Sequence, residues 1–146
     1  MLSSSFIKLM EVLPKPLVMK LAKMKVNGYM RKYAKINVKG LENIDKISGP
    51  KIFVCNHLSN SDALVLNEVL KRYDPTFVAG IKISNNPITS IGAMVVKKIS
   101  INPNIVDKDA IIKMVDILKG GNKLLIFPGG TRSRQEKIME RKKGVL

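Results

Sequence analysis

The sequence is short of the residues on which several classes of protein depend. Tryptophan is absent, and aromatic residues make up only 5% of the chain. Binding to single-stranded nucleic acid uses aromatic side chains as stacking platforms, so this scarcity argues against it. The single cysteine, Cys55, excludes an intrachain disulfide and suits a reducing compartment. Because Cys55 closes an apolar run, we interpret it as a small core residue rather than a nucleophile.

Long apolar runs are also missing. A helix that crosses a bilayer needs about 18 or more apolar residues in succession, and no such stretch occurs here. Lysines and prolines interrupt the N-terminal segment early, unlike the apolar centre of a signal peptide. We therefore expect neither a transmembrane helix nor a secretory signal.

Acidic residues are scarce relative to basic ones. The 26 lysines and arginines against 11 aspartates and glutamates give a formal charge of +15. Such an excess favours anionic partners, which include nucleic acid, anionic lipid, phosphorylated substrates and acidic proteins. No DNA-binding motif accompanies the charge, so we predict no nucleic-acid partner.

Residues 1–35 differ from the rest of the chain and form the first predicted unit. The first forty residues contain nine lysines and arginines and one acid, Glu11. Apolar residues recur among them at spacings of three and four, which predicts two short amphipathic helices broken near Pro14 and Pro16. Two hypotheses stay open for this unit. It lies on an anionic membrane surface, or it packs on its own domain with a solvated lysine face.

Residues 36–146 form the second predicted unit, in which strands and helices alternate. Strands are predicted at 36–40, 51–55, 76–81, 95–101 and 123–127, and helices at 61–73, 86–94 and 108–121. This order predicts an α/β fold with a mostly parallel or mixed sheet flanked by helices. Ligands of such sheets bind beyond the carboxyl ends of the strands. Residues 56–62 and 128–133 are therefore the candidate binding loops.

The first loop, "NHLSNSD", contains the only histidine, His57, and an aspartate five positions later, Asp62. A neutral imidazole can accept a proton, and a carboxylate on its other nitrogen sets the tautomer and stabilises the imidazolium. This pair resembles the base and orienting residue of a serine hydrolase without its nucleophile, which suits a reaction in which a substrate hydroxyl attacks. The alternative is structural, since Ser59-x-x-Asp62 also matches a helix capping box.

The second loop begins "FPGGTRS". Glycines allow backbone N–H groups to approach an anion closely, Thr131 can donate a hydrogen bond, and Arg132 can hold a phosphate through two parallel bonds. The alternative is a plain glycine turn with solvated arginines. A Walker loop is excluded, because no Gly-Lys-Ser/Thr follows a properly spaced glycine.

The two loops together resemble the glycerolipid acyltransferases, typified by the 1-acylglycerol-3-phosphate acyltransferases. Asn56, His57 and Asp62 match the first motif of that family, Asn-His-x4-Asp. Residues 127–133 match its third motif, Phe-Pro-Glu-Gly-Thr-Arg-Ser, at every position except Gly129. Between them "GAMVVKK" resembles the second motif, with Lys98 in the place of an arginine. The resemblance extends from about Ile36 to the C-terminus.

The resemblance implies transfer of a fatty acyl group in phospholipid synthesis, on the cytoplasmic face of a membrane. His57 would be the general base, oriented by Asp62, and would deprotonate a free hydroxyl of a (lyso)glycerol phosphate. The oxygen would attack the thioester of acyl-CoA or acyl carrier protein, so the expected partners are that donor, a lysophosphatidic acid-like acceptor and an anionic membrane, with no cofactor or metal. The implied substrate-binding residues are Asn56, Lys98, Gly130, Thr131, Arg132 and Ser133.

Two features depart from the family pattern. Gly129 replaces the glutamate of the third motif, which removes a carboxylate and adds backbone freedom. The family also continues beyond the third motif through a further strand and a fourth motif. We therefore expect residues 36–146 to be the N-terminal part of the domain, with an incomplete sheet and an exposed apolar edge. The alternative function is an inactive fragment that binds anionic lipid or membrane without turnover.

Overall fold

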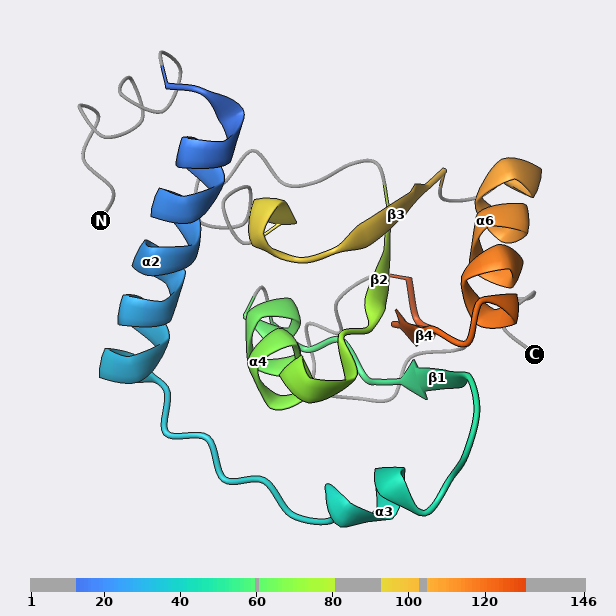
Figure 1. Cartoon of the computed structure of the whole chain (residues 1–146), viewed down its shortest axis with the longest axis horizontal. Helices are drawn as coiled ribbons and strands as arrows, with labels where there is room; N and C mark the ends of the chain where they lie inside the picture. Colours follow the sequence, from blue (N-terminus) through green and yellow to red (C-terminus); the bar gives the residue numbers. More distant parts are fainter. Residues whose placement is uncertain (1–12, 60, 81–92, 103–104, 131–146) are drawn as a thin grey trace.

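The computed structural model describes residues 13–59, 61–80, 93–102 and 105–130, and it shows an α/β fold (Figure 1). The elements, in chain order, are α2 (Lys15–Tyr33), α3 (Glu42–Asp45), β1 (Lys51–Val54), α4 (Asp62–Val69), the 3-10 helix η1 (Lys71–Tyr73), β2 (Thr76–Gly80), β3 (Lys98–Ile101), α6 (Lys108–Lys119) and β4 (Lys123–Ile126). The predicted fold class is therefore confirmed.

The described strands form one parallel sheet in the order β1-β4-β2-β3. The last strand, β4, lies between the first two: Leu124 is in register with Ile52 of β1, and Leu125 with Phe77 of β2. Since all these strands run the same way, their carboxyl ends meet at one edge of the sheet. The loops that follow β1 and β4 are consequently neighbours, as the sequence predicted.

Successive side chains of β4 pack on opposite faces of the sheet. Leu125 packs with Leu70, Phe77 and Val96 on the face that α4 covers. Leu124 packs with Ile99 and with Ala110 of α6 on the opposite face. Both leucines are fully buried, as expected for a strand with a neighbour on each side and a helix over each face.

The edge strand β1 is covered on one side only. Phe53 packs against the α4-side cluster, whereas Ile52 and Val54 are exposed large apolar residues. The prediction of a buried strand at 51–55 is wrong for the face of β1 that carries Ile52 and Val54, because α6 packs over β3 and β4 rather than over β1.

The boundaries of several predicted elements differ in the structure. Residues 36–40 are not a strand, since no described strand lies alongside to share hydrogen bonds with them. The strand predicted at 95–101 begins only at Lys98, because residues 93–95 are helical. The helix predicted at 61–73 ends at Val69 and continues as η1, which closes at Asp74 in a left-handed conformation. Most of the helix predicted at 86–94 lies outside the described residues.

The second N-terminal helix is longer than the short one that we expected. It is the single 19-residue helix α2, which begins directly after Pro14, and the first predicted helix lies outside the described residues. Proline suits this position, because the first N–H groups of a helix have no partner within it. None of the described helices combines the length and apolarity that crossing a bilayer requires.

Asp107 caps α6 and provides a test of this part of the fold. Its carboxylate accepts hydrogen bonds from the Asn102 and Ala110 amides, at 3.0 and 3.1 Å. These bonds, that of Asn102 foremost, hold the pKa of the Asp107 carboxyl below its ordinary value. Their contribution is present above the unfolded-state pKa and is lost as the pH falls through the folded-state value.

We expect Asp107→Ala to lower the melting temperature at pH 7, with a smaller difference from the native chain at about pH 3. Thermal unfolding followed by circular dichroism measures both values. Asp116→Ala, an exposed aspartate within the same helix, is the control and should change the melting temperature less. A difference that stays constant between the two pH values would contradict this account of the cap.

Candidate active site

His57 and Asp62 meet at the carboxyl edge of the sheet. The Cys55 N–H donates to the Ile126 carbonyl at 3.1 Å, which continues the pairing with β4 one residue past β1. The chain then leaves the sheet and turns into α4, whose first residue is Asp62. This turn places His57 Nδ1 2.8 Å from Asp62 Oδ2, with both side chains partly buried.

The same carboxylate oxygen also holds the loop together. Asp62 Oδ2 accepts hydrogen bonds from the backbone N–H groups of Leu58 and Ser59, at 2.7 and 2.8 Å. The bond from Ser59 is one half of the capping box, while the Ser59 hydroxyl accepts from the Ser61 N–H instead of completing the other half. Asp62 therefore has both of the roles that the sequence left as alternatives. It orders the loop and it contacts the histidine.

The hydrogen bond to Asp62 determines which nitrogen of His57 is available for chemistry. A carboxylate oxygen accepts hydrogen bonds, so His57 Nδ1 carries the hydrogen and donates the hydrogen bond to Asp62 Oδ2. In the neutral ring Nε2 is then the acceptor, and this is the nitrogen that can take a proton from a bound hydroxyl. The carboxylate would stabilise the imidazolium that results.

Phe127 supports the imidazole from the neighbouring strand end. Its ring stacks on that of His57, with centroids 4.4 Å apart and planes inclined by 25°. Phe127 directly follows β4, and β4 is the strand paired with β1. Phe127 is not among the site residues predicted from the sequence, although the aromatic position at the start of "FPGGTRS" was the available signal. The contact joins the two motifs physically.

The two glycines after Phe127 have different conformational roles. The Gly130 N–H donates to the Phe127 carbonyl at 3.0 Å and closes a tight turn, with φ of +64° at Gly130. A side chain is disfavoured at that angle, which gives a physical reason for glycine at this motif position. Gly129 is not among the described glycines with positive φ, so its backbone angle does not by itself require glycine. The predicted site residues Thr131, Arg132 and Ser133 lie outside the described residues.

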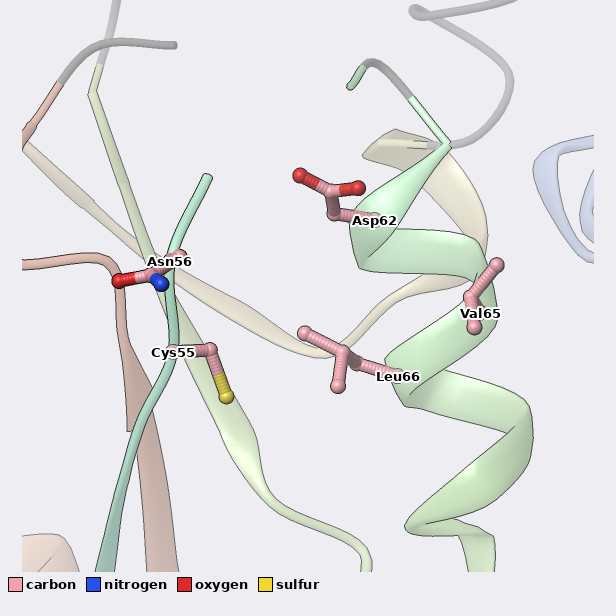
Figure 2. Close-up of a pocket in the computed structure, with 5 residues that line it drawn as sticks. All are labelled: Cys55, Asn56, Asp62, Val65 and Leu66. Atoms are coloured by element: carbon pink, nitrogen blue, oxygen red, sulfur yellow. The ribbon is translucent and has the colours of Figure 1, made fainter. Parts of the chain in front are cut away.

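A pocket of about 200 Å³ lies between the end of β1 and α4, beside the Asp62 carboxylate. Figure 2 shows the Cys55 sulfur and the Leu66 side chain pointing toward one another across it; Val65 and the predicted site residue Asn56 also line it. Burial, and to a smaller extent the charge of Asp62, raises the pKa of the Cys55 thiol. A protonated, partly buried thiol fits the interpretation of Cys55 as a packing residue.

Lys98, the remaining predicted residue, opens β3 in register with Phe77. It therefore lies on the α4 side of the sheet, the side where His57 stacks on Phe127. Lys98 is at the start of its strand, whereas His57 and Phe127 follow the carboxyl ends of theirs. Burial lowers the pKa of its ammonium group. Among the described residues it forms no ion pair.

Fold and site together define a class of protein, an α/β domain with a histidine–aspartate pair at the carboxyl ends of a parallel sheet. Comparison with known families gives the same result in more detail. A family model described as Acyltransferase matches residues 35–146, and the chain belongs to this family.

Two curated proteins show the same relationship. The chain is 29% identical over 117 residues to a chloroplastic 1-acyl-sn-glycerol-3-phosphate acyltransferase of Arabidopsis thaliana, an alignment that covers 78% of this chain and 32% of the relative. It is 26% identical over 117 residues to a chloroplastic protein of the same name from Brassica napus, with 78% and 33% covered. The chain thus spans about a third of the length of these relatives.

We expect Asp62→Asn to destabilise the protein by about 1–3 kcal/mol, because hydrogen bonds to a charged acceptor contribute more than those to a neutral one. Chemical denaturation measures the change, and faster amide exchange at Leu58 and Ser59 would locate it in the loop. Glu68→Gln is the control in the same helix, since the ion pair of Glu68 within the described part of the chain is a long 3.9 Å contact with Lys71. Equal stability losses in the two variants would contradict the role assigned to Asp62.

Proposed function

We propose that this chain catalyses transfer of a fatty acyl group from a thioester to a free hydroxyl of a lysoglycerol phosphate. The observation that carries the proposal is the 2.8 Å contact between His57 Nδ1 and Asp62 Oδ2, which leaves Nε2 as the proton acceptor. The names of the two relatives support the class of acceptor, since both are 1-acyl-sn-glycerol-3-phosphate acyltransferases. The donor is acyl-CoA or acyl carrier protein.

The reaction needs one base and no covalent enzyme intermediate. His57 Nε2 removes the proton of the acceptor hydroxyl as that oxygen attacks the thioester carbonyl carbon. The carbon–sulfur bond breaks, and the departing sulfur takes the proton from the imidazolium. The products are an ester and a free thiol. Throughout, Asp62 holds Nδ1–H and stabilises the charged ring, while Phe127 restricts its tilt.

The acceptor phosphate requires cationic or N–H donors near the same strand ends. The Gly130 turn follows directly after Phe127, and Lys98 has a partly buried ammonium group on the same side of the sheet. We propose both as phosphate contacts, together with Arg132, Thr131 and Ser133 from the remainder of the third motif. Asn56, which lines the pocket beside Asp62, would contact the substrate from the first motif. The acceptor is a lipid, so we place the reaction at an anionic membrane surface, on its cytoplasmic face.

Binding of anionic lipid without turnover is the second candidate function. The observation that favours it is Gly129, where the family has a glutamate. An ordered loop matters when geometry sets the rate, and loss of one carboxylate from the third motif would affect the reaction more than the binding of lipid.

We expect His57→Ala to lower the rate of acyl transfer about 1000-fold, the typical contribution of a positioned general base. The assay follows transfer from acyl-CoA or acyl carrier protein to lysophosphatidic acid by the full chain. His57→Gln tests the same loss with less change in volume, and Asn122→Ala, in the exposed turn before β4, is the control. Native activity in the His57 variants would exclude the assigned base, and inactivity of the native chain would favour lipid binding without turnover.

We expect Gly129→Glu to raise the rate, because it restores the carboxylate of the family motif at a position whose backbone angle does not require glycine. Gly130→Glu is the matched comparison: its φ of +64° disfavours any side chain, and this variant should lose activity. Steady-state rates with acyl-CoA and lysophosphatidic acid measure both effects. A loss of similar size in the two variants would show that the turn requires both glycines.

A further inference from the structure

The turn after β4 has a backbone donor that the fold does not use. The Gly130 N–H donates to the Phe127 carbonyl at 3.0 Å, so residues 127–130 form a β-turn with Pro128 and Gly129 at its centre. Since φ at Gly129 is not positive, the turn is not of type II, and proline in its second position suits type I. The bond that closes such a turn does not involve the N–H of its third residue. Among the described residues, the Gly129 N–H has no hydrogen-bond partner.

Pro128 explains why the chain turns at this point. β1 and β4 pair in parallel, and the Cys55 N–H donates to the Ile126 carbonyl at the end of their ladder. The next donor in a parallel ladder would be the N–H of residue 128, which proline lacks. The pairing therefore stops, and the backbone after residue 128 leaves β1 at the edge of the sheet that carries His57.

The Gly129 N–H lies close to the imidazole that the proposed reaction uses as its base. The Phe127 ring stacks on that of His57, with centroids 4.4 Å apart. Gly129 follows Phe127 by two residues, which span about 7 Å at most. His57 Nδ1 contacts Asp62, so the reacting atoms would lie at Nε2, on the opposite side of the ring. Backbone N–H groups in turns are among the donors with which proteins bind anions, and this one is available near the base.

The proposed acyl transfer places negative charge on an oxygen that His57 does not contact. As the acceptor oxygen bonds to the thioester carbon, its proton passes to His57 Nε2 and the C=O electron pair moves onto the carbonyl oxygen. When the C=O bond forms again, the carbon–sulfur bond breaks and the sulfur takes the proton from the imidazolium. Between these events the carbonyl oxygen is an oxyanion, a charge that enzymes stabilise with backbone N–H donors.

We propose that the Gly129 N–H donates a hydrogen bond to this oxyanion. The assignment rests on the proposed acyl transfer and adds a catalytic group to it. The donor belongs to the backbone, so it requires the turn rather than one residue type at position 129. The glutamate of the family motif would supply the same N–H. Removal of one such donor typically slows the chemical step about 100- to 1000-fold.

Replacement of Gly129 by glycolic acid tests the assignment, because it converts the amide into an ester and removes the N–H. In the full chain it should lower kcat about 100- to 1000-fold with acyl-CoA and lysophosphatidic acid, while both KM values change little. The shape of the pH profile of kcat should stay the same, since the base is intact. The same replacement at Gly49, an exposed glycine before β1, is the control and should leave kcat unchanged.

Three results of this experiment would overturn the assignment. Native kcat in the Gly129 ester chain would show that the N–H does not contact the oxyanion. A raised KM for lysophosphatidic acid with native kcat would assign the N–H to the acceptor phosphate. A lower melting temperature by circular dichroism in the Gly129 ester alone, with an altered pH profile of kcat, would assign it a structural role.

NMR tests the same hydrogen bond without turnover and so separates this assignment from the proposed reaction. The probe is a trifluoromethyl ketone analogue of acyl-CoA, whose hydrate has the tetrahedral carbon of the intermediate. The Gly129 amide proton should move downfield on titration, and more than that of Gly130, which already donates to Phe127. An inactive chain with this shift would contradict the acyl transfer but retain the anion site. An unchanged Gly129 signal at saturating analogue would overturn the assignment in an active or an inactive chain.

Discussion

The site depends on the insertion of β4 between β1 and β2. This strand is far from β1 in the sequence, yet Leu124 and Leu125 are buried on opposite faces of the sheet and join the helices of both sides to it. Parallel pairing then brings the chain after Val54 and the chain after Ile126 to the same edge. Without that pairing, the His57 and Phe127 rings would not be brought into contact.

Because β1 pairs with β4, side chains from two elements hold the His57 imidazole. Asp62 holds Nδ1 from the start of α4, and Phe127 stacks on the ring from the end of β4. Asp62 is itself held by the Leu58 and Ser59 amides, so the carboxylate orders the loop that carries the histidine. An exposed loop can thereby hold the imidazole in one orientation, as the role proposed for His57 as a base requires.

Several apolar surfaces of the described residues remain open after the core is formed. One is the outer face of β1, where Ile52 and Val54 are exposed because α6 covers the other strands. Others lie on helices, where Leu17 and Met24 of α2 and Ile111, Ile112 and Val115 of α6 are exposed.

Much of the site was predictable from the sequence, because spaced motifs determine chemistry directly. Asn56, His57 and Asp62 identified the family before any contact was known, and apolar runs alternating with helical periodicity predicted a parallel α/β sheet. Predictions from local patterns were wrong where a neighbouring strand or helix determines whether a segment forms a strand or is buried. Residues 36–40 have the composition of a strand but no strand beside them, and "KIFVC" was predicted to be buried on two faces although only one is covered.

The sequence by itself determined the family, the candidate base and its carboxylate, and the positive charge of the N-terminal helix. Only the tertiary structure decided that one oxygen of Asp62 both holds the loop and contacts His57, and that Phe127 stacks on the histidine. It also decided that the backbone angle favours glycine at position 130 and not at position 129. The reason is physical. Residue types and short spacings specify which chemistry is available, whereas stacking across strands and the sign of a backbone angle depend on how distant segments pack.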